Sequence, residues 1–161
     1  MVIHEQLSQP CLDAASRYLS YRPRSEFEVR ARLRQRGFDD LSIERVILKL
    51  KEQGVIDDLA FARFWKENRE SFNPRSRRML QRELRQKGVL PQIIAEVVAE
   101  VDDRRSAYRA AQRKASKLTS SDYHSFRRQF GAFLRRRGFD YEVTQHTVNQ
   151  LYQELEEDKN A

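Results

Sequence analysis

The sequence predicts an all-α protein: three tandem three-helix repeats stacked into an elongated, curved array. Two observations support this fold class. First, a short phrase that ends in glycine occurs three times, as LRQRG at 33–37, LRQKG at 84–88 and LRRRG at 134–138. Second, apolar residues around each phrase recur at the three- and four-residue spacing of amphipathic helices, and no alternating run is long enough to indicate a strand.

The spacing of the phrases sets the expected repeat length. Gly37, Gly88 and Gly138 lie 51 and 50 residues apart, a period typical of stacked helical repeats. Because such a repeat buries its apolar face against its neighbours, we interpret the whole chain, 1–161, as a single helical-repeat domain. The expected repeats span about 11–55, 57–101 and 102–157.

The first helix of each repeat is expected to supply bulk for the core. These helices are predicted at roughly 11–21, 58–72 and 103–118. We interpret Trp65, in the stretch DDLAFARFWKENRESF, as a core residue because other apolar side chains accompany it at helical spacing. The bulky core residues expected are Phe61, Phe64, Trp65 and Phe72, with Ala14, Ala15, Tyr18 and Tyr21 as smaller counterparts in the first repeat.

The second helix of each repeat ends at the shared glycine, which adopts the left-handed backbone that other residues resist. Apolar pairs four residues apart mark its buried face: Val29 and Leu33, Leu80 and Leu84, Phe130 and Leu134. Ser25 and Ser76 each follow Pro-Arg and are candidate N-caps, although Pro74 also suits a first helical turn. The third repeat lacks this start and reads DYHSF at 122–126.

The third helix of each repeat has core positions at offsets of 0, 3, 4 and 7. These positions hold Ile43, Val46, Ile47 and Leu50; Ile94, Val97, Val98 and Val101; and Thr144, Thr147, Val148 and Leu151. The two threonines weaken the last apolar face, which suits a terminal repeat with a solvent-facing side.

The residue types of catalysis and metal binding form no motif in this sequence. Cys11 is the one cysteine, so we expect a buried thiol and no disulfide within the chain. No second ligand stands at a metal-site spacing from the histidines His4, His124 and His146. Helix capping explains the acidic pairs Asp39-Asp40, Asp57-Asp58 and Asp102-Asp103. We therefore expect no enzyme, no cofactor and no metal.

The sequence also predicts where the protein is located in the cell. No apolar run approaches the ~20 residues of a membrane helix, and the first ten residues lack the layout of a signal peptide. We expect a cytoplasmic monomer that does not enter a membrane.

Charge is the main indication of a partner. Basic residues outnumber acidic ones by 31 to 24, for a net charge of +7 and a pI near 9.8, which favours a polyanionic partner, nucleic acid first. The predicted basic surface consists of Arg24, Arg30, Arg34, Arg36, Arg75, Arg78, Arg82, Arg85, Lys87, Arg127, Arg128, Arg135 and Arg137. Arginine suits this role because its planar fork grips phosphate oxygens. We expect the three second helices to lie side by side, so that their arginines join.

A purely structural explanation competes with this one, because basic side chains in a last helical turn complement the helix dipole. It accounts for Arg36, Lys87 and Arg137. It does not account for Arg75, Arg78 and Arg82, which we place in the first half of their helix. With Arg85 they are spaced by three, four and three residues, in one stripe.

Two stretches closely resemble the central repeat of the bacterial RecX family: GVIDDLAFARFWKENR at 54–69 and PRSRRMLQRELRQKGV at 74–89. PRSEFEVRARLRQRGF at 23–38 and LRRRGFDYEVTQHTV at 134–148 resemble parts of its first and third repeats. The resemblance covers roughly 11–155. The third repeat departs from the family pattern in its missing Pro-Arg-Ser start and its threonines.

The resemblance implies a negative regulator of the RecA recombinase that is not an enzyme. Its implied partners are the RecA filament, in whose groove it would lie, and single-stranded DNA, with little sequence preference. The implied effect is inhibition of the ATPase, strand-exchange and co-protease activities, by blocked extension or by disassembly of the filament. The residues alone leave two alternatives open: a stand-alone nucleic-acid-binding repeat protein, and a protein-binding adaptor whose arginines pair with an acidic surface.

Overall fold

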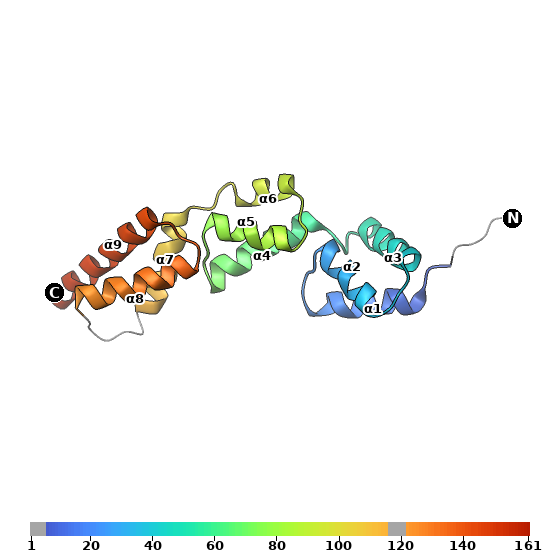
Figure 1. Cartoon of the computed structure of the whole chain (residues 1–161), viewed down its shortest axis with the longest axis horizontal. Coiled ribbons are helices and arrows are strands. Elements are labelled where there is room, and N and C mark those ends of the chain that lie inside the picture. Colours follow the sequence, from blue (N-terminus) through green and yellow to red (C-terminus); the bar gives the residue numbers. More distant parts are fainter. Residues whose placement is uncertain (1–5, 116–121) are drawn as a thin grey trace. The chain divides into compact units, whose positions relative to one another are not determined.

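The computed structural model describes residues 6–115 and 122–161, and these form nine α-helices in three three-helix groups (Figure 1). The helices are α1 (Gln9–Tyr21), α2 (Glu26–Gln35), α3 (Asp40–Glu52), α4 (Asp58–Phe72), α5 (Arg77–Gln86), α6 (Pro91–Val98), α7 (Asp103–Ala115), α8 (Tyr123–Arg136) and α9 (Tyr141–Lys159). The described residues contain no strand. The all-α class and the three groups are confirmed. The predicted helix at 103–118 reaches residues 116–118, and these, like His4, lie outside the described residues.

The described residues pack as two compact units. One contains the chain up to Trp65 together with Leu84–Val97, and the other contains Lys66–Glu83 together with Val98–Ala161. The boundary passes through α4 and α5, so the middle group contributes to both units. The single domain and the curved array stay predictions.

The core of the first group follows the predicted helical spacing. Cys11 and Ala15 of α1 meet the buried pair of α2 and four buried residues of α3. These partners are Val29, Leu33, Ile43, Val46, Ile47 and Leu50. Cys11 is buried, as its position predicted, and this burial raises the pKa of its thiol.

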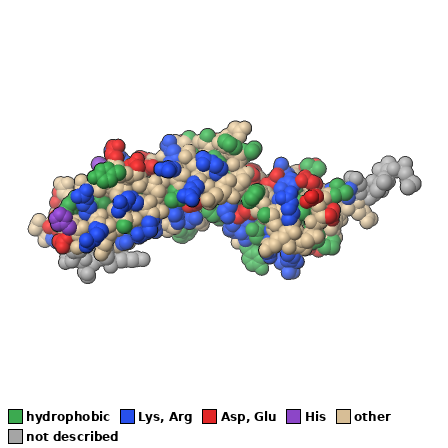
Figure 2. Space-filling model, viewed as in Figure 1, with side chains coloured by type: hydrophobic (Ala, Val, Ile, Leu, Met, Phe, Trp, Pro, Cys, Tyr) green, Lys and Arg blue, Asp and Glu red, His purple; other side chains and the backbone are tan. Residues whose placement is uncertain are grey.

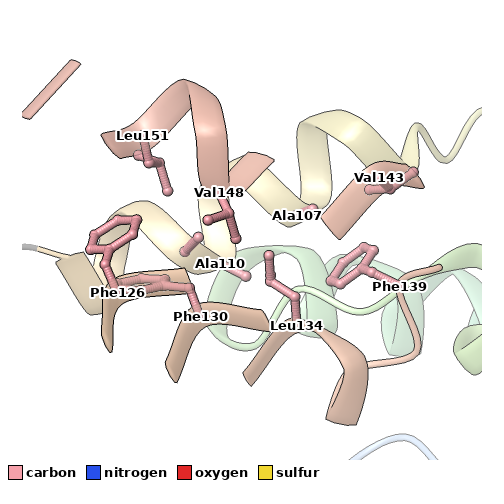
Figure 3. Close-up of a cluster of buried hydrophobic side chains, with 10 residues drawn as sticks. Ala107, Ala110, Phe126, Phe130, Leu134, Phe139, Val143, Val148 and Leu151 are labelled. Atoms are coloured by element: carbon pink, nitrogen blue, oxygen red, sulfur yellow. The ribbon is translucent and has the colours of Figure 1, made fainter. Parts of the chain in front are cut away.

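The core of the third group is built around the aromatic residues of α8. Phe126, Phe130 and Leu134 face Val148 and Leu151 of α9 (Figure 3). The rings of Phe126 and Phe130 stack with centroids 4.3 Å apart.

The threonine positions of α9 correct one expectation. Thr144 and Thr147 are 2% and 1% exposed, so this face is part of the core and does not point to solvent. The Thr147 hydroxyl donates to the carbonyl of Val143 at 2.8 Å. That bond lets a polar side chain occupy an apolar position.

Some bulky residues predicted for the core lie elsewhere. Phe61 is buried, but Phe72 is 76% exposed and Tyr21 is 77% exposed. Trp65 is half-buried, and Arg22 Cζ and Lys87 Nζ lie 5.8 and 5.2 Å from the centre of its ring. The interpretation of Trp65 as a core residue is therefore wrong, because its side chain is only half-buried and packs against two cations.

The predicted caps hold at the helix starts. Ser25 forms a reciprocal capping box with Glu28 at the start of α2, and the Ser76 hydroxyl accepts from the amide of Met79 at 3.0 Å. Because α5 begins at Arg77, Pro74 precedes it. At the starts of α3, α4 and α7, the side chains of Asp39, Asp57 and Asp102 accept hydrogen bonds from backbone amides. Asp122 replaces the missing serine cap of the third repeat by accepting from the amide of Ser125 at 2.8 Å.

The second helices of the three groups, α2, α5 and α8, contact one another end to end at two places, which we call joints. Each joint lies within one unit. At the first joint the Ser25 hydroxyl donates to the carbonyl of Lys87 at 2.7 Å. A Cβ on Gly88, whose φ is +74°, would lie 2.5 Å from that of Phe27.

The second joint repeats this arrangement. The Ser76 amide donates to the carbonyl of Arg137 at 3.1 Å. Gly138, with φ +90°, lies against Ser76 and Met79 in the same close way. The expected side-by-side placement of these helices is wrong at both joints, because the contacts join a helix start to a helix end.

Candidate nucleic-acid interface

The structure divides the predicted basic surface into two sets. Eight members are exposed, and we call them the exposed arginines: Arg34, Arg36, Arg78, Arg82, Arg85, Arg127, Arg128 and Arg135. The other five are half-buried: Arg24, Arg30, Arg75, Lys87 and Arg137.

Two half-buried arginines hold the first group together. The Arg24 guanidinium lies 4.0 Å from the centre of the Tyr18 ring. Arg30 pairs with Glu26 at 3.1 Å and also with Glu44 on α3. Both guanidinium groups contact residues of the same group, so these side chains stabilise the fold.

Two half-buried arginines of the second unit are similarly engaged. Arg75 Nε lies 3.5 Å from a carboxylate oxygen of Glu83, and Arg137 donates to the Asn73 side chain at 3.1 Å. Burial, with repulsion from Arg75 and Arg136, lowers the pKa of Arg137. Arg75 precedes α5, so its expected place in the stripe of the middle helix is wrong.

Lys87 belongs to a cluster around the buried carboxylate of Glu28, which the sequence analysis missed. This carboxylate accepts from Arg22 at 2.6 Å, from Lys87 at 3.0 Å and from the Ser25 amide at 3.0 Å. Burial raises the pKa of Glu28, but these hydrogen bonds outweigh it and hold the pKa below its usual range. The Ser-x-x-Glu spacing of Ser25 and Glu28 is the sequence pattern that could have revealed the contact between them.

We expect Glu28→Gln to reduce the free energy of unfolding by about 1–3 kcal/mol at pH 7, because two cations lose a charged acceptor. Since the folded-state pKa of Glu28 is depressed, this stabilisation is present above the unfolded value of about 4.3. It is lost as the pH falls through the folded-state pKa. Urea unfolding of both proteins between pH 7 and pH 3 measures the difference.

The matched control is Glu44→Gln, since Glu44 is exposed and its loss should have a much smaller effect. An unchanged difference between wild type and Glu28→Gln across this pH range would contradict the cluster's electrostatic role.

The arginines of α5 form an exposed stripe opposite its buried face. Arg78, Arg82 and Arg85 are exposed, while Leu80 and Leu84 are 0% exposed. Within the described residues, none of these three arginines has an ion-pair partner. Figure 2 shows basic side chains over α5 and α8. The stripe therefore presents donors that the fold leaves unused.

The arginines of α8 surround a hollow on the third group. Arg127, Arg128 and Arg135 line it, together with His124, Gly131, Tyr141, Thr144 and Gln145. Its volume is about 260 Å³. The three arginines were predicted from the sequence, but the hollow was not, because Tyr141, Thr144 and Gln145 come from the next helix.

Other kinds of site are not found in the part of the chain that is described. Its His, Cys, Asp and Glu side chains form no group of three that would hold a metal ion. None of its helices is both long enough and apolar enough to cross a membrane.

Comparisons with known proteins decide the family. Residues 11–50 match the family described as "RecX, first three-helix domain", and residues 57–98 match "RecX, second three-helix domain". The regulatory protein RecX of Prosthecochloris aestuarii is 34% identical over 144 residues, which cover 89% of this chain and 95% of that protein. The chain belongs to the RecX family.

Further comparisons extend the family match. The regulatory protein RecX of Chlorobium limicola is 34% identical over 86% of this chain and 87% of its own length. The crystal structure of RecX from Lactobacillus salivarius matches with a TM-score of 0.70 at 21% identity, over 89% of this chain and 96% of that one. This structural likeness supports the three-helix groups as the RecX fold.

Proposed function

We propose that this protein is a negative regulator of RecA that binds in the groove of the RecA–single-stranded-DNA filament through its exposed arginines. In this role it inhibits the ATPase, strand-exchange and co-protease activities of RecA. Its membership of the RecX family supports a regulatory role. The observation that carries the proposal is the stripe of α5, where three exposed arginines have no ion-pair partner within the described residues.

The chemistry of the stripe fits a filament that exposes phosphate and acidic side chains. A guanidinium binds phosphate or carboxylate oxygens through two parallel donors. Arg78, Arg82 and Arg85 follow one another at four- and three-residue spacing, so one helix face presents all three. Contacts of this kind do not read bases, so we expect little sequence preference.

The test compares binding to RecA alone, to single-stranded DNA alone and to the assembled filament, together with RecA ATP hydrolysis. We expect the filament to bind most tightly and ATP hydrolysis to fall. With about six phosphates neutralised, log K should decrease with log salt at a slope near −4.

Two outcomes would replace the proposal. Equal affinity for bare DNA and filament would indicate a stand-alone nucleic-acid-binding protein. Binding to RecA that needs no DNA would indicate a protein-binding adaptor.

A further inference from the structure

The hollow on the third group combines an open volume with positive charge. About 260 Å³ is several times the ~30 Å³ that one water occupies in the liquid. Three exposed arginines of α8 and the first turns of α9 form its walls. No acidic side chain is among the lining residues.

One wall of the hollow contains a buried hydroxyl without a partner. Thr144 lines the hollow and is 2% exposed, and its Oγ1 has no hydrogen bond within the described structure. Thr147, three residues later, satisfies its hydroxyl on its own helix. Since buried polar groups are normally hydrogen-bonded, Thr144 lacks an acceptor that a ligand would supply.

The first repeat has an ion-paired set at the equivalent positions. Aligned on the shared glycines, positions 127, 131 and 145 correspond to 26, 30 and 44. In the first group Arg30 stands at the position of Gly131 and pairs with Glu26 and Glu44.

The third repeat replaces each member of that ion-paired set. Arg127 and Gln145 stand where the first repeat has the two glutamates, and Gly131 stands where it has the arginine. Thr144 stands where the first repeat has Ile43. These four changes remove the internal acids and open the site, so an anion from outside would complete it.

Gly131 keeps the hollow open at a cost to its helix. It lies inside α8, where glycine is less favourable than alanine. A Cβ added to it would meet no atom within 4 Å. Packing therefore does not demand a glycine here, and a larger side chain at this position would take up part of the open volume that Gly131 lines.

We propose that this hollow binds a phosphate group, held by Arg127, Arg128 and Arg135 with the Thr144 hydroxyl as a further donor. The same chemistry is found in a nucleic-acid backbone and in a free nucleotide. Tyr141, which is 70% exposed, places an aromatic ring at the rim where a base can stack. This inference deepens the proposed function, and it rests on that function only for the source of the phosphate.

The experiment follows amide signals of the full ¹⁵N-labelled chain during titration. The probes are inorganic phosphate, thymidine monophosphate and a short oligothymidylate, each against sodium chloride at equal ionic strength. We expect shifts confined to 124–135 and 141–145, which chloride does not reproduce. Tighter binding of the oligonucleotide assigns the backbone as the source, and tighter binding of the mononucleotide assigns a free nucleotide.

Three variants of the hollow and one control outside it make the test specific. Thr144→Val keeps shape and removes the hydroxyl, so affinity should fall about tenfold while the melting temperature is kept or raised. Gly131→Gln installs the residue of the middle repeat and should abolish the local shifts. Arg128→Gln should weaken binding, whereas Arg136→Gln, which removes an exposed charge outside the hollow, should not.

The inference fails if chloride produces the same shifts, if neither phosphate nor the oligonucleotide shifts these signals, or if folded Thr144→Val binds as tightly as the parent. Those results would leave the proposed function standing wherever RecA ATP hydrolysis is still inhibited. Loss of phosphate binding and loss of RecA inhibition are therefore measured separately.

Discussion

Replacing Arg78, Arg82 and Arg85 together with glutamate is expected to abolish inhibition of RecA-dependent ATP hydrolysis. Each change turns an attraction for phosphate or carboxylate into a repulsion. The fold should be nearly unaffected, since the three side chains are exposed and exposed charges contribute little to stability. ATP hydrolysis on single-stranded DNA, titrated with each protein beside a thermal melt, measures both effects.

The matched control changes three exposed basic residues of other helices, Arg17, Lys49 and Arg109, to glutamate. It lowers the net charge by the same six units, so it separates the α5 stripe from charge in general. We expect this control to inhibit far better than the α5 variant. Equal inhibition by the parent and the α5 variant would show that the stripe serves solvation alone.

Phe130→Ala is expected to reduce the free energy of unfolding by about 3–5 kcal/mol. Phe130 is 0% exposed, stacks on Phe126 and lies in the middle of the third core (Figure 3). Its removal leaves a cavity that the aromatic neighbours cannot fully close. Urea unfolding followed by circular dichroism measures the change.

Phe72→Ala is the control, because Phe72 is 76% exposed although it is the same residue type in another helix. We expect a change within about 0.5 kcal/mol. Comparable losses in the two variants would mean that the third core does not depend on Phe130.

The sequence predicted the helical cores well because burial on a helix follows a local spacing. The pair Leu80 and Leu84 is buried as expected, and the same spacing located the exposed stripe opposite it. The caps Ser25 and Ser76 were found because they act on amides three residues away.

The errors arose where a residue's partner lies far along the chain. Lys87 meets Glu28 across 59 residues, and spacing within one helix cannot reveal such a pair. Trp65 was misplaced for the same reason, since Arg22 and Lys87 cover its ring. Phe72 shows a further limit, because apolar bulk alone does not state which face of a helix is buried.

The candidate site was predicted in part. Eight of the thirteen predicted basic residues are exposed, while five are engaged with their own fold. A count of positive charges cannot separate these sets, because the engaged ones depend on contacts such as Arg30 with Glu44. The hollow of the third group was missed because its buried threonine appeared only as a weak core position.

The two joints give the middle repeat a separate connecting element for each of its neighbours. The middle repeat carries a serine, Ser76, that contacts the third repeat and a glycine, Gly88, that contacts the first. A tandem duplication of this repeat would copy the serine and the glycine that make the two contacts together. Lengthening the protein by whole segments therefore needs no new connecting chemistry, whereas losing part of a segment would leave one half without its match.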